Sequence, residues 1–199
     1  MSEMSGVDKF IKVNTNNLHP AKGRLLPSEP LMGDYYFGRS VVLLAEHNEE
    51  GSFGLVLNKP LSDPFNDVVQ DFPEFNGGLY VGGPVDTNSL FFVHTLGDAI
   101  EGSLEIGSGL FWGGDIEIVK EMILLKAITP NDIRFSIGYS GWSPNQLDDE
   151  LKRNSWLVSK DLNKDILKVD PKNLWQSLLE PLGDEYSHWP KFPTNPGLN

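Results

Sequence analysis

Two apolar, valine- and leucine-rich segments separated by a four-residue turn impose the strongest constraint on how this chain folds. The segments are RSVVLLAEH (39–47) and SFGLVLNK (52–59), and Asn48-Glu49-Glu50-Gly51 lies between them. Apolar runs that flank a short polar turn containing glycine are typical of a β-hairpin. A hairpin pairs its strands antiparallel, so the sheet that contains it is not purely parallel.

Further apolar segments predict that the sheet extends beyond this hairpin and that helices accompany it. Additional strands are expected at LYVGGPV (79–85), LFFVHTL (90–96), SLEIGSGLFWG (103–113), DIRFSIGYS (132–140) and near residues 156–158. Helices are expected over 63–72, from Asp115, from Pro144 and over 170–179. This mixture predicts an α/β fold of the mixed α+β type: a compact mixed β-sheet with a β-hairpin, flanked by three to four helices.

The length of the chain and the distribution of its apolar residues predict the domain organisation. At 199 residues the chain is long enough for one sizeable domain. We expect an N-terminal arm over 1–22, where apolar residues show no sustained period. A single compact α/β domain, or two interlocked subdomains, should follow over 23–185. Residues 186–199 include three prolines within HWPKFPTNPGLN and are predicted to form an irregular tail.

Composition disfavours several kinds of site. The chain has no cysteine, so disulfides, thiolate nucleophiles and cysteine-built metal sites are absent. The four histidines stand far apart in the sequence, so a zinc site would require the fold to bring them together; we expect no metal and no cofactor. No apolar run approaches the roughly 18 residues of a membrane helix, and no secretory signal is visible. We therefore expect a cytoplasmic protein without a membrane partner.

Acidic residues dominate the charge of the chain. Its formal net charge is −12, and residues 60–119 contain ten Asp and Glu but no Lys or Arg. Proteins that bind duplex DNA usually carry a basic face. We interpret the acidic segment as a solvated surface, with a docked metal or cationic partner as the alternative. Neither interpretation includes direct nucleic-acid binding.

The segment IGYSGWSPNQLDDEL (137–151) predicts a tight turn from a strand into a helix. Ser143 and Gln146 have the spacing of a capping box with Ser143 as N-cap, and Pro144 suits the first helical position. The turn is therefore consistent without any ligand. Trp142 within it either packs over the strand end or faces a ligand.

A charged group near the hairpin is the best candidate for chemistry. Glu46 and His47 precede the turn, and Arg39 lies at the start of the same strand. An acid, an imidazole and a guanidinium together would suit acid–base chemistry or anion binding. The alternative is that they are strand-end charges that keep the hairpin soluble. Arg39 alone would either hold a carboxylate or phosphate or form a surface salt bridge.

Glycine-rich strand ends supply the other candidates. We expect Gly82-Gly83-Pro84 and Tyr139-Ser140-Gly141 to lie side by side and to form one face of the main cleft. Such glycines either let a ligand approach the backbone or allow a sharp exit from the strand. The candidate ligand-binding residues are Arg39, Glu46, His47, Gly82, Gly83, Tyr139, Ser140, Gly141, Trp142 and Gln146.

Five segments, taken in order, resemble a known family. They are GRLLPSEPLMGDYYFGRSVVLLAEHNEEGSFGLVLNKP (23–60), VGGPV (81–85), LFFVHTL (90–96), GLFWGGD (109–115) and RFSIGYSGWSPNQLDDEL (134–151). Together they resemble the bacterial YqgE/AlgH family, also called uncharacterised protein family 0301. The resemblance implies a cytosolic α/β protein with no established reaction, and one member's name suggests transcriptional regulation. The chain departs from the common Gly-Trp-Gly-Pro-Gly-Gln form by carrying Ser143 and Asn145.

These observations favour a non-catalytic cytosolic protein that binds a small anionic molecule or a protein partner, in a regulatory role. The alternative is a hydrolase or transferase that uses Glu46, His47 and Arg39. A substrate screen separates the two, because only the enzyme would turn a substrate over.

Duplex DNA should bind this protein weakly. Each phosphate contact needs a cation, and a chain with a net charge of −12 repels a polyanion. A fluorescence anisotropy titration of a labelled duplex at about 0.15 M salt should therefore show no saturation below the micromolar range. Sub-micromolar affinity would contradict this expectation.

Overall fold

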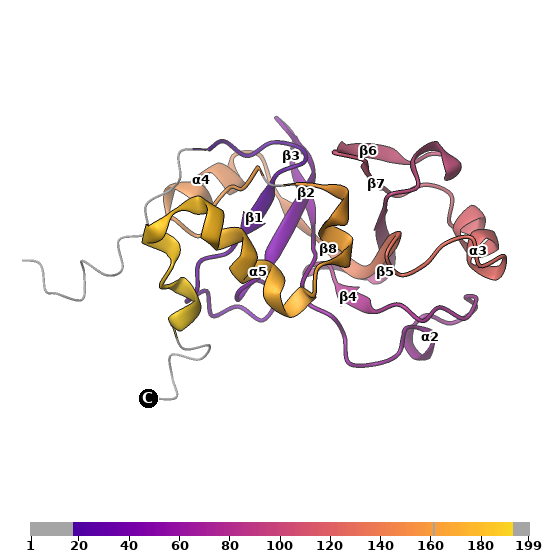
Figure 1. Cartoon of the computed structure of the whole chain (residues 1–199). Coiled ribbons are helices and arrows are strands. Elements are labelled where there is room, and N and C mark those ends of the chain that lie inside the picture. The colour runs from indigo at the N-terminus through magenta and orange to yellow at the C-terminus, as the bar shows by residue number, and fades with distance from the viewer. Residues whose placement is uncertain (1–17, 161, 193–199) are drawn as a thin grey trace, which may run out of the picture.

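A curled, mainly antiparallel β-sheet forms the centre of the structure, and helices pack around it (Figure 1). The computed structural model describes residues 18–160 and 162–192. The strands are β1 (Leu25–Pro27), β2 (Val41–Asn48), β3 (Gly51–Val56), β4 (Leu79–Val81), β5 (Val85–His94), β6 (Leu104–Gly107), β7 (Leu110–Trp112) and β8 (Ile133–Trp142). Their order is β1-β2-β3-β8-β5-β7-β6, and β4 pairs with β8 outside that path. The pairs are antiparallel except β4 with β8, which confirms the predicted mixed sheet.

The described residues contain four α-helices, as predicted. They are α2 (Phe65–Val68), α3 (Ile116–Leu124), α4 (Gln146–Lys152) and α5 (Pro171–Leu179). The start of α3 is confirmed, because Asp115 accepts a hydrogen bond from the Glu117 amide at 2.8 Å. Short 3₁₀ helices occupy Gly97–Ala99, Lys164–Lys168, Glu180–Leu182, Asp184–Tyr186 and Trp189–Lys191. No helix in the described ranges is long and apolar enough to cross a membrane.

The predicted hairpin is confirmed as β2 and β3. Its register pairs Asn48 with Gly51, and the Asn48 side chain closes the turn by accepting a hydrogen bond from the Glu50 amide at 2.8 Å. A Cβ at Gly51 would lie 2.2 Å from the carbonyl oxygen of Trp142, so only glycine fits there. The hairpin turn therefore sits directly on the end of β8.

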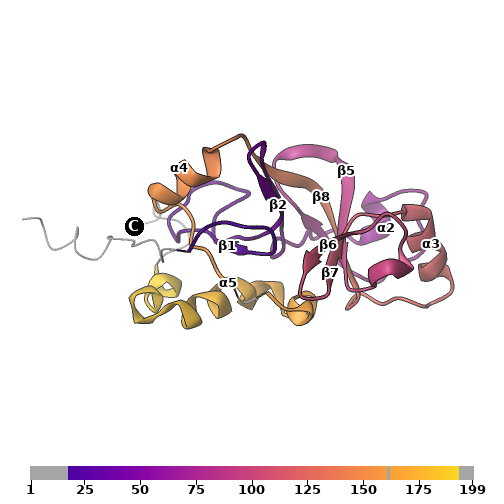
Figure 2. The same ribbon diagram turned by 90° about the horizontal axis from the view of Figure 1, so that it is seen from above.

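Both faces of β2 are buried, which explains its unbroken apolar run. Val41 and Leu43 belong to a cluster with α5, whereas Val42 and Leu44 belong to a cluster with α4. Successive residues of a strand point to opposite faces. Figure 2 shows these two helices on opposite sides of β1 and β2. A strand that is covered on both faces has no polar side, so its sequence does not alternate.

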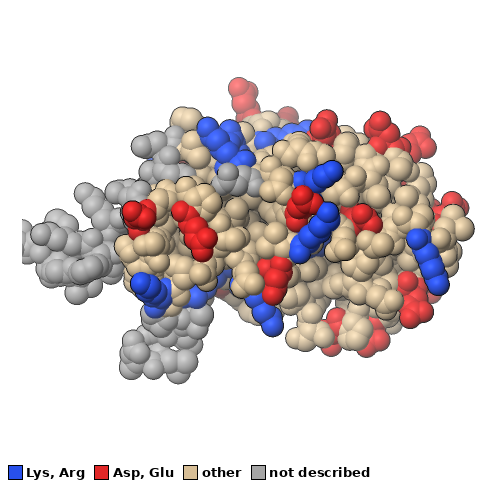
Figure 3. Space-filling view, in the orientation of Figure 1, with Lys and Arg blue, Asp and Glu red and all other residues tan. Residues whose placement is uncertain are grey.

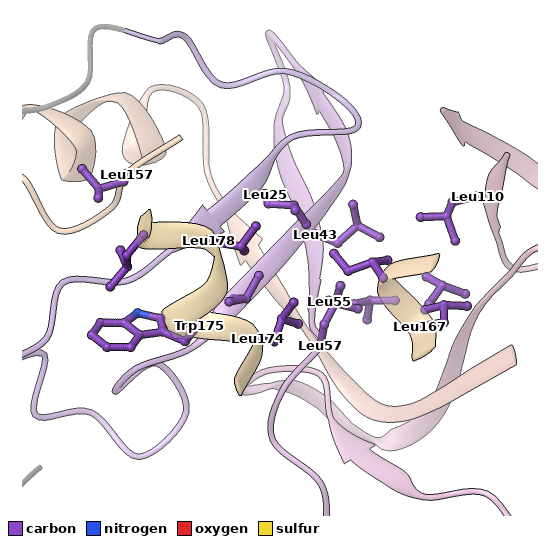
Figure 4. Close-up of a cluster of buried hydrophobic side chains, with 14 of the residues drawn as sticks. Leu25, Leu43, Leu55, Leu57, Leu110, Leu157, Leu167, Leu174, Trp175 and Leu178 are labelled. Carbon is purple, nitrogen blue, oxygen red and sulfur yellow. The ribbon is translucent and has the colours of Figure 1, made fainter. Parts of the chain in front are cut away.

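The largest buried cluster lies between α5 and the β1–β3 part of the sheet. Leu174 and Leu178 of α5 lie against leucines of the first strands (Figure 4). Tyr186 and Trp189 join this cluster with 1% and 4% of their surface exposed. The segment expected to be an irregular tail therefore packs on the core up to Phe192. The rest of that tail, 193–199, and residues 1–17 of the expected arm lie outside the described residues.

β8 joins the two halves of the sheet. Its first part pairs with β4 and β5, and its last residues pair with β3. Phe135 is fully buried in the cluster under α2 and α3. The neighbouring Arg134 donates hydrogen bonds to the carbonyls of Leu57 at 2.8 Å and Leu167 at 2.7 Å, and its guanidinium lies over the Tyr80 ring. Burial lowers the pKa of Arg134, although a guanidinium stays protonated at neutral pH.

Several expected elements differ from the structure. The strand expected over 103–113 is a hairpin of β6 and β7, because Ser108 and Gly109 adopt φ of 54° and 78° and reverse the chain. The helix expected over 63–72 is limited to α2, because Val69 is extended. The strand expected near 156–158 forms only isolated bridges with the β1 segment.

The completely buried His94 connects β5 to the loop after β7. Its Nδ1 accepts a hydrogen bond from the Leu96 amide at 3.2 Å, so the proton lies on Nε2, which faces the Gly113 carbonyl at 3.2 Å and the Ser103 hydroxyl at 3.0 Å. Burial lowers the pKa of His94, and the bond to Gly113 opposes this in part. The folded protein therefore holds a neutral imidazole.

Lowering the pH from about 7.5 to about 5.5 should destabilise the protein through His94. The unfolded chain takes up a proton near pH 6.5 whereas the folded chain resists it, so the free energy of unfolding falls with pH by at most about 1.4 kcal/mol per unit for this group. A His94→Gln variant should be less stable at the higher pH but show a flatter dependence. Urea denaturation at each pH measures both free energies of unfolding. If wild type and His94→Gln lose stability equally as the pH falls, His94 is not the group responsible.

Candidate functional site

A hollow of about 500 Å³ lies where the β2–β3 turn meets the end of β8; we call it the hairpin-tip groove. It is lined by Glu46, Asn48, Glu50, Gly51, Ser52, Phe53, Val85, Tyr139, Gly141, Trp142, Ser143 and Pro144. The lining comes from the β2–β3 hairpin and its turn, from the first residue of β5, and from the end of β8 with the turn that follows it. Its position is therefore set by the sheet itself.

Aromatic rings form the floor of the hairpin-tip groove. The strand register pairs Phe53 with both Glu46 and Gly141, so these three residues share one row on one face of the sheet. The rings of Phe53 and Tyr139 lie 4.9 Å apart, and Trp112 packs behind Phe53 at 4.6 Å. A floor of this kind offers the negatively charged faces of aromatic rings to a ligand.

Gly141 keeps this floor open. A Cβ at this position would lie 3.0 Å from Cε2 of Tyr139 and 3.8 Å from a methyl carbon of Val85. The missing side chain thus leaves the space between these two side chains empty. A larger residue at position 141 would occupy part of the hairpin-tip groove.

The charge of the hairpin-tip groove is negative. Glu46 is half-buried beside Phe53, and Glu50 is exposed on the turn above it. The lining contains no Lys, Arg or His. Two carboxylates beside aromatic faces favour a cationic group, since both attract positive charge.

A second, smaller hollow of about 340 Å³ lies on the other side of the same hairpin tip. It is lined by His47, Asn48, Glu49, Gly51, Ser52, Ser143, Asn145, Leu147 and Asp148. His47 Nδ1 lies 2.8 Å from the Ser52 hydroxyl. Because successive strand residues alternate, Glu46 lines the first hollow and His47 the second. The proposed acid–imidazole pair is thus split between two faces of the sheet.

Arg39 lies at the opposite end of β2 from the hairpin tip. At about 3.3 Å per residue, the strand separates it from Glu46 by roughly 20 Å. Its guanidinium donates to the Phe192 carbonyl and lies 5.2 Å from the Trp175 ring centre, so it holds the C-terminal segment against α5. Burial lowers the pKa of the neighbouring Lys59. The charge of Asp34 raises this pKa, and the charge of Arg39 lowers it. The expectation that Arg39 reaches the cleft is wrong.

The two glycine-rich strand ends lie side by side, as expected. Val85 pairs with Tyr139, and the Ser140 hydroxyl donates to the Gly82 carbonyl at 3.0 Å. A Cβ at Gly83 would lie 2.3 Å from the Tyr139 carbonyl, so the close approach is made by the chain itself and not by a ligand. Tyr139 reaches the hairpin-tip groove, whereas Gly82, Gly83 and Ser140 are buried beneath it.

Trp142 is part of the core, so of its two predicted roles the structure supports packing over the strand end and not contact with a ligand. Only 6% of its surface is exposed, and its Nε1 donates to the Glu150 carboxylate at 2.9 Å. Trp156 Nε1 donates to the same oxygen at 2.8 Å, and the Gln146 side-chain amide donates to the other oxygen at 3.0 Å. Glu150 thus ties α4 to β8 and to the following segment. No periodicity in the sequence singled out Glu150, because its partners meet only in the folded chain.

The helix after β8 begins later than predicted. Ser143 does not cap it: α4 starts at Gln146, and Asn145 occupies the N-cap in the left-handed region at φ 64° without a side-chain cap. One half of the capping box survives, because the Gln146 side chain accepts a hydrogen bond from the Ser143 amide at 3.0 Å. Asparagine tolerates left-handed backbone better than most residues. The glycine of the common family form at position 145 would suit it better still.

Two kinds of catalytic arrangement can be compared with the geometry: a metal site and a serine–histidine pair. No group of three or more His, Asp and Glu that could hold a metal ion occurs within the described ranges. Ser103 and His94 are 3.0 Å apart, but Nε2 carries the proton and cannot take one from the hydroxyl. His47 contacts the Ser52 hydroxyl at the hairpin tip, and no carboxylate of the described residues is hydrogen-bonded to its ring.

A family model described as AlgH-like, domain of unknown function 179, matches residues 25–187. The chain belongs to this family. It is 46% identical to a UPF0301 protein from Bacteroides thetaiotaomicron over 96% of this chain and 97% of that relative. A UPF0301 protein from Bacteroides fragilis is 44% identical over the same shares. The resemblance seen in the five sequence segments is thereby confirmed.

Two solved structures share the AlgH-like fold. A crystal structure from Corynebacterium diphtheriae superposes with a TM-score of 0.73 at 23% identity, covering 95% of this chain and all of the other. The solution structure of the AlgH protein from Pseudomonas aeruginosa gives a TM-score of 0.58 at 31% identity, covering 77% and 80%. The first supports the fold alone, and the second supports both the fold and the family.

Replacing Glu150 should cost far more stability than replacing Ser143. Glu150→Ala removes the acceptor of two indole N–H groups, both on buried rings, and we expect a loss of about 2–3 kcal/mol. Ser143→Ala should change the free energy of unfolding by less than about 0.5 kcal/mol, because its hydroxyl caps nothing. Urea denaturation measures both, and a loss near 1 kcal/mol for Ser143→Ala would restore the capping-box prediction.

Proposed function

We propose that this AlgH-like protein is a non-catalytic binding protein whose hairpin-tip groove accepts a cationic group, presented by a protein partner or by a small molecule. The observation that carries the proposal is the combination of two aromatic faces, Phe53 and Tyr139, with two carboxylates, Glu46 and Glu50, in one hollow without a basic residue. A regulatory role would follow from binding a partner without chemically changing it.

The chemistry of the lining selects for a cation in two ways. A cation over an aromatic face contributes about 0.5–1 kcal/mol at an exposed site and more when water is displaced. A nearby carboxylate adds about 0.2–1 kcal/mol at the surface. An anion would face repulsion from both. The ammonium groups of lysine and polyamines and the guanidinium group of arginine fit these requirements.

This proposal replaces the anionic ligand expected from the sequence. That expectation depended on Arg39, which is engaged with Phe192 and Trp175 at the other end of β2. The hydrolase or transferase alternative depended on Arg39, Glu46 and His47 acting together, and these three do not share a hollow. The adjoining hollow adds Glu49 and Asp148, so the hairpin tip as a whole is acidic.

Titration with spermidine and with N-acetyl-arginine amide tests the proposal. Amide NMR spectra should show saturable shifts of Gly51, Ser52 and Gly141, which line the hairpin-tip groove. Glu46→Gln should weaken binding about threefold, since a surface charge pair of this kind contributes under about 1 kcal/mol. Gly141→Ala should weaken it further, because the new methyl group occupies the space beside Tyr139.

Glu121→Gln is the matched control, since it removes the same charge from the exposed face of α3, far from the hairpin tip. It should leave the affinity within experimental error. Succinate, as an anionic probe, should cause no saturable shift at these amides. Saturation with succinate, or equal weakening by Glu121→Gln and Glu46→Gln, would overturn the proposal.

A further inference from the structure

Two neighbouring leucines stand out from the surface at the end of α3. Leu124 is 69% exposed and Leu125 is 78% exposed, whereas Val119 and Ile123 on the other face of the helix are buried. Figures 1 and 2 both place α3 at the end of the molecule opposite the described C-terminal helices. Two adjacent, highly exposed leucines at the end of an ordered helix form an exposed apolar patch, a feature that often marks an interaction site.

The end of α3 fixes these leucines in place. The helix closes with a Schellman motif, in which the Ala127 amide bonds to the Met122 carbonyl and the Lys126 amide to the Ile123 carbonyl. Lys126 occupies the left-handed position at φ 55°, where glycine is usual. The exposed leucines therefore belong to a defined turn and not to a fraying end.

A hollow of about 590 Å³ lies beside them; we call it the α3 groove. It is lined by Pro73, Glu74, Phe75, Asn76, Ile123, Leu124, Lys126, Ile128, Thr129 and Pro130. Six of these ten residues are apolar, and the others include one acid and one base. Among the described residues the ion pairs are Glu117 with Lys120, Asp149 with Lys152 and Asp165 with Lys168, so Glu74 and Lys126 have no ion-pair partner there.

We propose that the α3 groove binds a second copy of this chain in a two-fold symmetric dimer. Leu124 forms part of the wall of the hollow and the exposed Leu125 follows it in the sequence, so in this dimer a two-fold axis beside the hollow seats Leu125 of each copy in the hollow of the other. The same operation places Glu74 of one copy against Lys126 of the other, and the reverse. In the proposed dimer, each copy therefore offers the other a leucine for its hollow and a charge opposite in sign to the one beside it.

Charge argues for a second copy over a strongly basic partner at this surface. Figure 3 shows basic and acidic side chains close together at the α3 end of the molecule, so this end is not uniformly acidic. The net charge of −12 opposes association at long range. Near 0.15 M salt, however, charges more than about 8 Å apart are largely screened. The interface would be small, and we expect a dissociation constant on the order of 10 µM.

Sedimentation equilibrium of the full chain between about 1 and 300 µM, at about 0.15 M salt, tests the dimer. The wild type should pass from monomer to dimer in this range. Leu125→Glu should raise the dissociation constant at least about tenfold, because it buries a carboxylate in an apolar hollow. Tyr35→Glu is the matched control: it introduces the same charge at a site 77% exposed, in the loop that packs near α4, and should leave the dimer unchanged.

A charge exchange then tests the two-fold arrangement. Glu74→Lys and Lys126→Glu should each weaken the dimer, because each places like charges together across the interface. The double variant should restore the affinity to within about threefold of wild type. Circular dichroism on every variant ensures that only folded chains are compared. A protein that stays monomeric at 300 µM, a dimer indifferent to Leu125→Glu, or a double variant no tighter than the single ones would overturn the proposal.

Discussion

Close backbone contact between β8 and its neighbours, made at glycines on both sides, is the constraint on which the rest of the structure depends. A Cβ at Gly51 would lie 2.2 Å from the Trp142 carbonyl, one at Gly83 would lie 2.3 Å from the Tyr139 carbonyl, and one at Gly138 would lie 2.6 Å from the Gly83 carbonyl. In each case the obstacle is backbone, which cannot rotate away as a side chain can. These contacts hold the hairpin turn, the start of β5 and the end of β8 in one place.

The hairpin-tip groove is a consequence of that packing. Its floor comes from β3 and β8, and its acidic residues come from β2 and the turn, so no flexible loop has to close to assemble it. Glu150 completes the support by fixing Trp142 from the α4 side. A site built on strands in this way holds its geometry before a ligand arrives, which reduces the ordering cost of binding.

Local signals predicted the elements whose shape is decided locally. The hairpin followed from its turn residues, and the start of α3 followed from Asp115, because each of these depends on a few adjacent residues. Predictions that joined distant residues had mixed outcomes: the two glycine-rich strand ends lie side by side as expected, but the placement of Arg39 is wrong. Arg39 bonds to Phe192, which is 153 positions away, and nothing near Arg39 in the sequence indicates this.

The turn after β8 lies between these two cases. The sequence predicts its position, but the spacing of Ser143 and Gln146 carries no information on the left-handed backbone of Asn145, which moves the start of α4 to Gln146. The role of Glu150, like that of Arg39, depends on residues that are brought together by the fold. Its hydrogen bonds to Trp142 and Trp156 exist only once β8, α4 and the following segment have come together.

The position of β8 in the chain has a consequence for synthesis. The strand that joins both halves of the sheet spans Ile133–Trp142, and the seven other strands of the described chain are all made before it. A ribosome adding about 5–20 residues per second therefore exposes β3, β4 and β5 for several seconds before their common partner emerges. During that interval their edges and apolar faces are uncovered. The nascent chain, more than the finished protein, is the form most exposed to aggregation and most in need of a chaperone.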